Sequence, residues 1–120
     1  MTLEHFPRRL LHLEGLGVLG AALVLYFEAD YGWLPLVILF LAPDLSMLGY
    51  LGGPAVGAFS YDLVHTYALP LGLGIVGVLG DSGTAVQMAL IWAAHIGMDR
   101  LLGYGLKYPT AFKDTHLQRV

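Results

Sequence analysis

Apolar residues along this chain fall into four long runs, which short polar or glycine-containing turns separate. The length of each run is close to that of a helix that crosses a bilayer, which needs about 20 residues. The pattern therefore predicts an all-α fold: a four-transmembrane-helix antiparallel bundle that occupies the whole chain, 1–120, as one domain. The predicted spans cover roughly residues 10–27, 33–48, 54–79 and 84–104.

Two prolines bear on the third predicted span. Pro54 stands at its start, where a proline suits the first helical turn. Pro70 lies well inside it, and we expect a kink there because proline removes a backbone hydrogen bond and crowds the preceding turn. The turns between spans are short, so each helix is expected to run antiparallel to the one before it.

The composition favours membrane spans over a soluble core. Of the 120 residues, 57% are hydrophobic and 12% are charged, about half the charged share of an ordinary soluble domain. A net charge of −3 gives no sign of a nucleic-acid-binding surface. The chain has no cysteine, which excludes disulfides, thiolate metal sites and cysteine nucleophiles.

Basic residues predict the orientation of the bundle. Arg8 and Arg9 precede the first span, whereas the turns after the first and third spans carry only acidic charges. The basic residues that follow the fourth span are Lys107, Lys113 and Arg119. Since lysine and arginine concentrate in cytoplasmic loops, we expect both termini to be cytoplasmic.

Ionisable residues interrupt the apolar spans. Each costs about 3 kcal/mol near the centre of a membrane helix, so a protein that keeps several is expected to turn them inward and pair them. They are Glu14, Asp44, Asp62, His65, His95, Asp99 and Arg100. With a rise of about 1.5 Å per residue, antiparallel helices bring the acids and histidines into one layer, in the cytoplasmic half of the bundle.

The spacing and charge of these residues favour a metal site. Asp62 and His65 share a helix face, as do His95 and Asp99. Four carboxylates with one arginine cannot all stay ionised in a medium of low dielectric constant, so protons, charged histidines or a bound cation must balance them. Carboxylates with imidazoles suit iron, manganese or zinc. We predict one or two divalent ions, with ligands drawn from Glu14, Asp44, Asp62, His65, His95 and Asp99.

This set parallels the di-iron carboxylate bundles, which take one acid from each of two helices and an acid-x-x-histidine pair from each of the other two. Glu14 and Asp44 would be the single acids, and Asp62 with His65 would be one pair. His95 and Asp99 depart from the pattern in order and spacing.

Together these features predict a membrane metalloenzyme, either a hydrolase or a di-metal oxidoreductase, acting on a lipidic or apolar substrate. The metal would activate water or handle oxygen, and Tyr61 and Arg100 would orient or stabilise the substrate. Membrane lipid is the expected partner. The spacing of Gly49, Gly53 and Gly57 indicates close helix packing or the seam of a homodimer, and packing is the simpler interpretation.

Three alternatives use the same residues. In a transporter or channel subunit, the acids and histidines would pass protons or a divalent cation. In a purely structural network, Arg100 would pair with Asp99 or Glu14 and fix the helix register without chemistry. Haem ligation by His65 and His95 ranks last, because four nearby acids are poor surroundings for a haem.

Several motifs resemble a known family: Ala42–Tyr50, Tyr61–His65, His95–Arg100 and Gly103–Tyr108. Over nearly its whole length the chain is similar to a small bacterial four-helix membrane family that is catalogued only as a domain of unknown function. The resemblance implies an integral protein of a bacterial inner membrane and brings no activity. A weaker likeness, through Pro43-Asp44 and Asp62-x-x-His65, is to membrane-bound metal-dependent hydrolases, whose His-Arg-Gly and Thr-His-Ser signatures this chain lacks.

Overall fold

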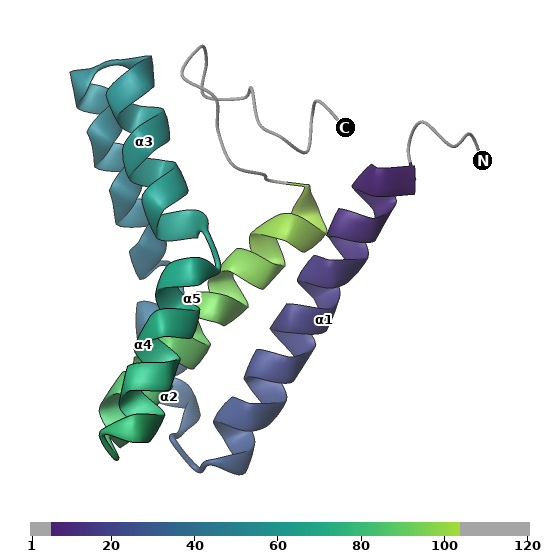
Figure 1. Ribbon diagram of the computed structural model, residues 1–120, viewed down its shortest axis with the longest axis vertical. Coiled ribbons are helices and arrows are strands. Elements are labelled where there is room, and N and C mark those ends of the chain that lie inside the picture. The colour runs from purple at the N-terminus through teal and green to yellow at the C-terminus, as the bar shows by residue number, and fades with distance from the viewer. Residues whose placement is uncertain (1–5, 104–120) are drawn as a thin grey trace.

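The computed structural model describes residues 6–103, and every regular element in this range is helical. The elements are α1 (Phe6–Glu28), α2 (Trp33–Leu39), the 3₁₀-helix η2 (Ala42–Gly52), α3 (Pro54–His65), α4 (Ala68–Leu79) and α5 (Gly83–Leu102). α2 continues into η2 and α3 into α4, so the chain makes four helical passes that alternate in direction (Figure 1). The predicted all-α, four-helix antiparallel fold is confirmed.

Three of the four passes are long and apolar enough to cross a membrane: Phe6–Glu28, Trp33–Gly52 and Pro54–Leu79. α5 has 20 residues but is not among these three, and it carries His95, Asp99 and Arg100. The second pass extends to Gly52, beyond the predicted end at residue 48. The predicted end of the fourth span and the basic residues after it, Lys107, Lys113 and Arg119, lie outside the described residues.

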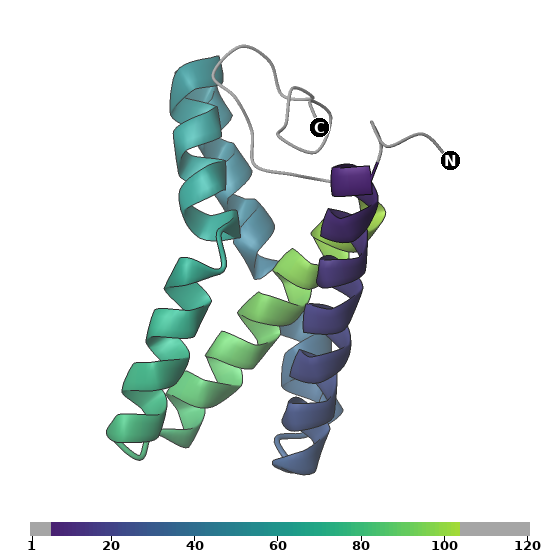
Figure 2. The ribbon, with the colours of Figure 1, turned by 45° about the vertical axis from the view of Figure 1, so that its right-hand side comes forward.

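Two prolines break the second and third passes at similar heights (Figures 1 and 2). Pro70 offers no amide to the carbonyl of Thr66, four residues earlier, and α3 ends with Thr66 in an extended conformation. Pro43 likewise offers no amide to the carbonyl of Leu39, which lies four residues earlier and is the last residue of α2. The predicted kink near Pro70 is confirmed, whereas the break at Pro43 was not predicted.

Residues suited to turns and caps end the passes. Gly53, between η2 and α3, has a φ of 106°, a value that favours glycine. Ser82 caps the start of α5 by accepting a hydrogen bond from the Ala85 amide at 3.2 Å. These signals make the connections short and keep consecutive passes antiparallel.

α5 lies between α1 and α4 and packs on both, while η2 packs mainly on α3 (Figure 2). The α1–α5 contact is a close approach of two backbones at Gly15 and Gly97. A Cβ atom added to Gly97 would lie 2.7 Å from the Leu19 amide nitrogen and 2.8 Å from the Gly15 carbonyl oxygen. Only glycine at these positions permits this crossing.

The η2–α3 hairpin is also packed through glycine. A Cβ atom added to Gly49 would overlap the side chain of Ser60, and one added to Gly57 would overlap the ring of Tyr50. The close-packing interpretation of these two glycines is therefore confirmed within one chain. A homodimer seam stays a prediction.

Candidate metal centre

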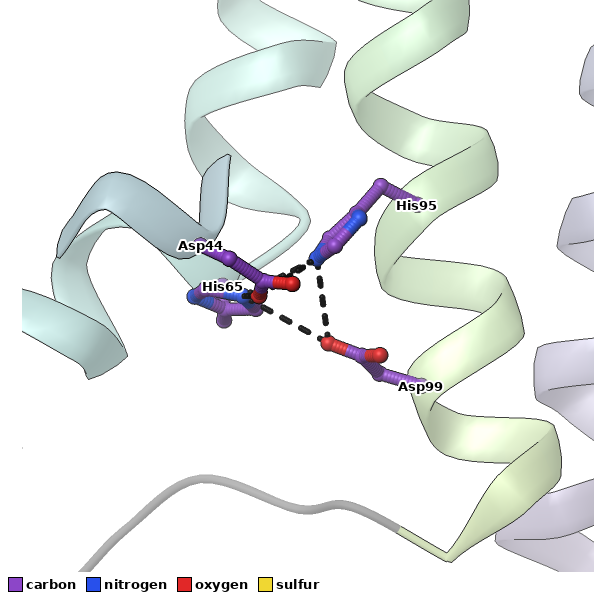
Figure 3. A group of neighbouring side chains, drawn as sticks. All are labelled: Asp44, His65, His95 and Asp99. Atoms are coloured by element: carbon purple, nitrogen blue, oxygen red, sulfur yellow. Dashed lines mark hydrogen bonds and ion pairs between the residues drawn. The ribbon is translucent and has the colours of Figure 1, made fainter. Parts of the chain in front are cut away.

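Asp44, His65, His95 and Asp99 converge where the two proline breaks meet α5 (Figure 3). Asp44 lies in the first turn of η2, directly after Pro43, and His65 is the last residue of α3. His95 and Asp99 occupy successive turns of α5. Each side chain offers one donor atom, and the four donor atoms all lie within 4.8 Å of one another.

Five of the six separations between donor atoms are close to those around a single small cation. The two Nε2 atoms lie 3.2 Å apart. The His95 Nε2 is 3.1 Å from Asp44 Oδ1 and 3.2 Å from Asp99 Oδ2, and the His65 Nε2 is 3.3 and 3.4 Å from the same two oxygens. Four ligands at the 2.0–2.2 Å bond lengths of zinc form a tetrahedron with edges of about 3.3–3.6 Å.

Proton positions also favour a cation among these atoms. The Nδ1 of His65 donates to the Tyr61 carbonyl oxygen at 2.9 Å, so the Nε2 of neutral His65 carries a lone pair that faces the cluster. An outer hydrogen bond of this kind is typical of histidines that bind metals. Two ionised carboxylates and two neutral imidazoles carry a charge of about −2, which one divalent ion neutralises.

The centre is closed on three sides and open on one. The side chains of His65 and His95 are fully buried, and that of Asp99 is 8% exposed. The side chain of Asp44 is 35% exposed. Asp44 is thus the ligand at which an exchangeable ion or another molecule would enter.

Tyr61 supports two of the four residues. Its ring stacks on the His65 imidazole, with centroids 3.7 Å apart and an interplanar angle of 7°. Its hydroxyl donates a long hydrogen bond of 3.4 Å to Asp99 Oδ2. Because its carbonyl also accepts from His65, Tyr61 holds one histidine and one carboxylate in place, and it is itself buried.

Two side chains of α5 bind carbonyl groups at the break between α3 and α4. The Arg100 Nη2 donates to the His65 carbonyl oxygen at 3.0 Å, and the Trp92 Nε1 donates to that of Val64 at 2.6 Å. The end of a helix leaves such carbonyls without intrahelical partners. Arg100 and Trp92 therefore fix α3, and with it His65, against α5.

Glu14 and Asp62 are not among the four grouped residues. Glu14 is exposed on α1, which approaches α5 on the face of Gly97, opposite His95 and Asp99. Asp62 is half-buried on α3, one position around the helix from the Tyr61–His65 face that meets α5. The structure thus brings together four of the six predicted ligands.

The geometry also bears on depth and on haem. His65 is the twelfth residue of α3 and precedes a further helix of 12 residues, so the centre lies near the middle of the third pass, deeper than the sequence suggested. A haem with two axial histidines needs the porphyrin plane between the two rings. Here both Nε2 atoms converge on one point together with two carboxylates, which leaves no place for a porphyrin between the rings. The alternative of haem ligation by His65 and His95 is therefore wrong.

Comparison with known families finds a match over residues 8–120 to a family described as a domain of unknown function (DUF4260). No curated protein and no solved structure matches the chain significantly. The predicted resemblance to a family of unknown function is confirmed, and the family description adds no chemistry to the site.

Proposed function

The chain belongs to this family of unknown function, and from its site we propose a membrane metalloprotein that holds a divalent ion between Asp44, His65, His95 and Asp99. The observation that carries the proposal is the convergence of four donor atoms from three helical segments at separations of 3.1–3.4 Å along five edges. Two imidazoles with two carboxylates suit zinc, iron or manganese.

We propose one ion per chain. Two-metal sites place their ions about 3.5–4 Å apart and need carboxylates that reach both. Here all donor atoms of the group lie within 4.8 Å of one another, and the extra acids Glu14 and Asp62 lie outside it. This spacing supports a mononuclear centre over the dinuclear alternative.

The proposed location is a membrane, with both termini in the cytoplasm. Three apolar passes support the location, and the polar residues His95, Asp99 and Arg100 of α5 are buried within the chain, away from lipid. The start of α1 and the end of α5 lie at the same end of the molecule (Figure 1). Arg8 and Arg9 at the start of α1 favour the cytoplasmic side for that end.

A metal-dependent reaction is the proposed use of the centre. A divalent ion supplies Lewis acidity and lowers the pKa of a bound water. The exposed side of Asp44 gives a substrate or water access, and the depth of the centre favours a lipid-soluble substrate. Tyr61 and Arg100 contact the ligand residues His65 and Asp99, so we assign them to positioning these ligands.

The metal content of detergent-purified protein tests this proposal. We expect about one equivalent of zinc, iron or manganese in the wild type by plasma mass spectrometry, and its loss in His65→Ala combined with His95→Ala. Binding of an ion at 100 times its Kd stabilises a protein by about 2.7 kcal/mol, so a chelator should lower the Tm of the wild type and leave that of the double variant unchanged.

Wild-type protein that holds no metal when purified, and gains neither metal nor stability when supplied with these three ions, would refute the proposal. The cluster would then be a hydrogen-bonded network. A metal that binds and also crosses the membrane of sealed vesicles would replace catalysis with transport.

A further inference from the structure

A long apolar groove runs between α1 and α4, with α5 as its floor. Its volume is about 590 Å³, within the range of sites that bind small molecules. Residues that line it include Val18, Tyr67, Pro70, Gly74, Val86 and Ala89. Tyr67 brings the one hydroxyl of the lining, and that oxygen is fully buried, so the groove presents a hydrocarbon surface.

The backbone explains why the groove is open. α1 and α4 both pack on α5 and stand on either side of it (Figure 2). On the groove side of α4, Gly74 has no side chain to fill the space, and a Cβ atom added there would meet only the Cβ of Ala89, at 3.5 Å. A missing side chain on one helix thus leaves a channel along its neighbour.

The length of the groove matches one leaflet of a membrane. Tyr67 and Leu79 both line it, and at 1.5 Å per residue the helix between them measures about 18 Å. Half of a hydrocarbon core is about 15 Å thick. Tyr67, two residues after His65, forms the inner end of the groove. The centroid of the Tyr67 ring lies 5.8 Å from the guanidinium carbon of Arg100.

We propose that this groove binds one acyl chain of a membrane lipid, taken from the leaflet that surrounds the Leu79 end of α4. A concave, narrow and apolar surface suits a single flexible chain. A stable dimer instead needs a broad, well-packed interface that buries about 1,200–2,000 Å², so we assign the groove to lipid and not to a second copy. The inference rests on the proposed membrane location and is independent of the metal.

Photolabelling of the full chain in phosphatidylethanolamine vesicles tests this site. The probe is phosphatidylethanolamine with a diazirine on one palmitoyl chain, and labelled peptides are mapped by mass spectrometry. We expect labelling to concentrate on the residues that line the groove. Gly74→Leu fills the groove and should reduce labelling there at least fivefold.

Gly72→Leu is the matched control, because Gly72 lies on the same helix outside the groove with open space around it. Leucine favours helix over glycine, so both variants should fold. Equal labelling of the two variants, or labelling spread evenly over α1 and α4, would overturn the inference. So would a dimer that Gly74→Leu converts to monomer, since a second copy would then fill the groove.

Chelator-treated protein separates this inference from the proposed metal. Groove labelling that persists after metal removal, and that Gly74→Leu still abolishes, supports the lipid site whatever the metal analysis finds. Groove labelling that disappears on chelation would contradict a site built from helix packing alone.

Discussion

The two faces of α5 are held to their neighbours by opposite means. On one face, Gly97 meets Gly15 of α1, and the backbones approach so closely that no side chain fits between them. On the other face, His95 and Asp99 meet Asp44 and His65 through polar atoms separated by 3.1–3.4 Å. The first contact depends on shape, and the second on charge balance.

This difference divides the molecule into two units. α1 and α4 each pack on α5, whereas η2 packs mainly on α3. The candidate centre takes Asp44 and His65 from the hairpin and His95 and Asp99 from α5. An ion at this position therefore couples the hairpin to the rest, and its removal should loosen the hairpin more than the glycine contact.

We expect the largest loss of stability from a substitution that breaks the glycine contact between α1 and α5. Gly97→Leu forces a side chain against the backbone of α1, which cannot move aside as a flexible side chain can. Overpacking costs about 1–3 kcal/mol and occasionally more, and a clash with backbone should lie at the upper end of this range, so we expect a Tm lower by about 10 °C in a thermal melt in detergent.

Gly17→Leu is the control for this substitution, because Gly17 lies on α1, the helix that Gly97 contacts, and a side chain added there meets open space. A Gly97→Leu variant as stable as Gly17→Leu would show that the two helices do not touch as described.

An intermediate effect tests the support of the metal ligands. Tyr61→Phe keeps the ring that stacks on His65 and removes the hydroxyl that donates to Asp99. Loss of an outer-shell partner typically weakens metal binding 10–100-fold, and since this bond is long we expect about tenfold in a chelator-competition titration.

Tyr26→Phe is the matched control, because the Tyr26 hydroxyl accepts from Gln87 between α1 and α5, away from the centre. Equal metal affinities for the two variants would remove Tyr61 from the ligand support.

The smallest expected effect concerns the acids that the structure leaves outside the centre. Asp62→Asn and Glu14→Gln should leave the metal stoichiometry unchanged, whereas Asp44→Asn should abolish tight binding, because Asp44 alone among these three acids offers an oxygen to the cluster. Metal analysis of the three variants measures this. Loss of metal in Asp62→Asn or Glu14→Gln would show that the substituted acid binds the ion, as the six-residue prediction from the sequence holds.

Local signals in the sequence led to much of the fold and part of the site. Apolar runs of span length predicted the four passes, and Pro70 predicted the break that ends α3. The ionisable residues of the spans supplied all four members of the cluster. They also supplied two acids that do not join it, because the sequence does not say which face of α1 or α3 turns toward α5.

The sequence by itself determined that the chain is helical, rich in span-length apolar segments, and equipped with costly polar residues that need partners. These properties follow from residue type and short spacing. The tertiary structure alone decided the partners. The Gly15–Gly97 contact places α1 on the face of α5 that lies opposite the candidate centre. The breaks at Pro43 and Pro70 bring Asp44 and His65 next to the other face of α5. Rotation of each helix about its axis depends on long-range packing, so the sequence pattern of one helix cannot fix it.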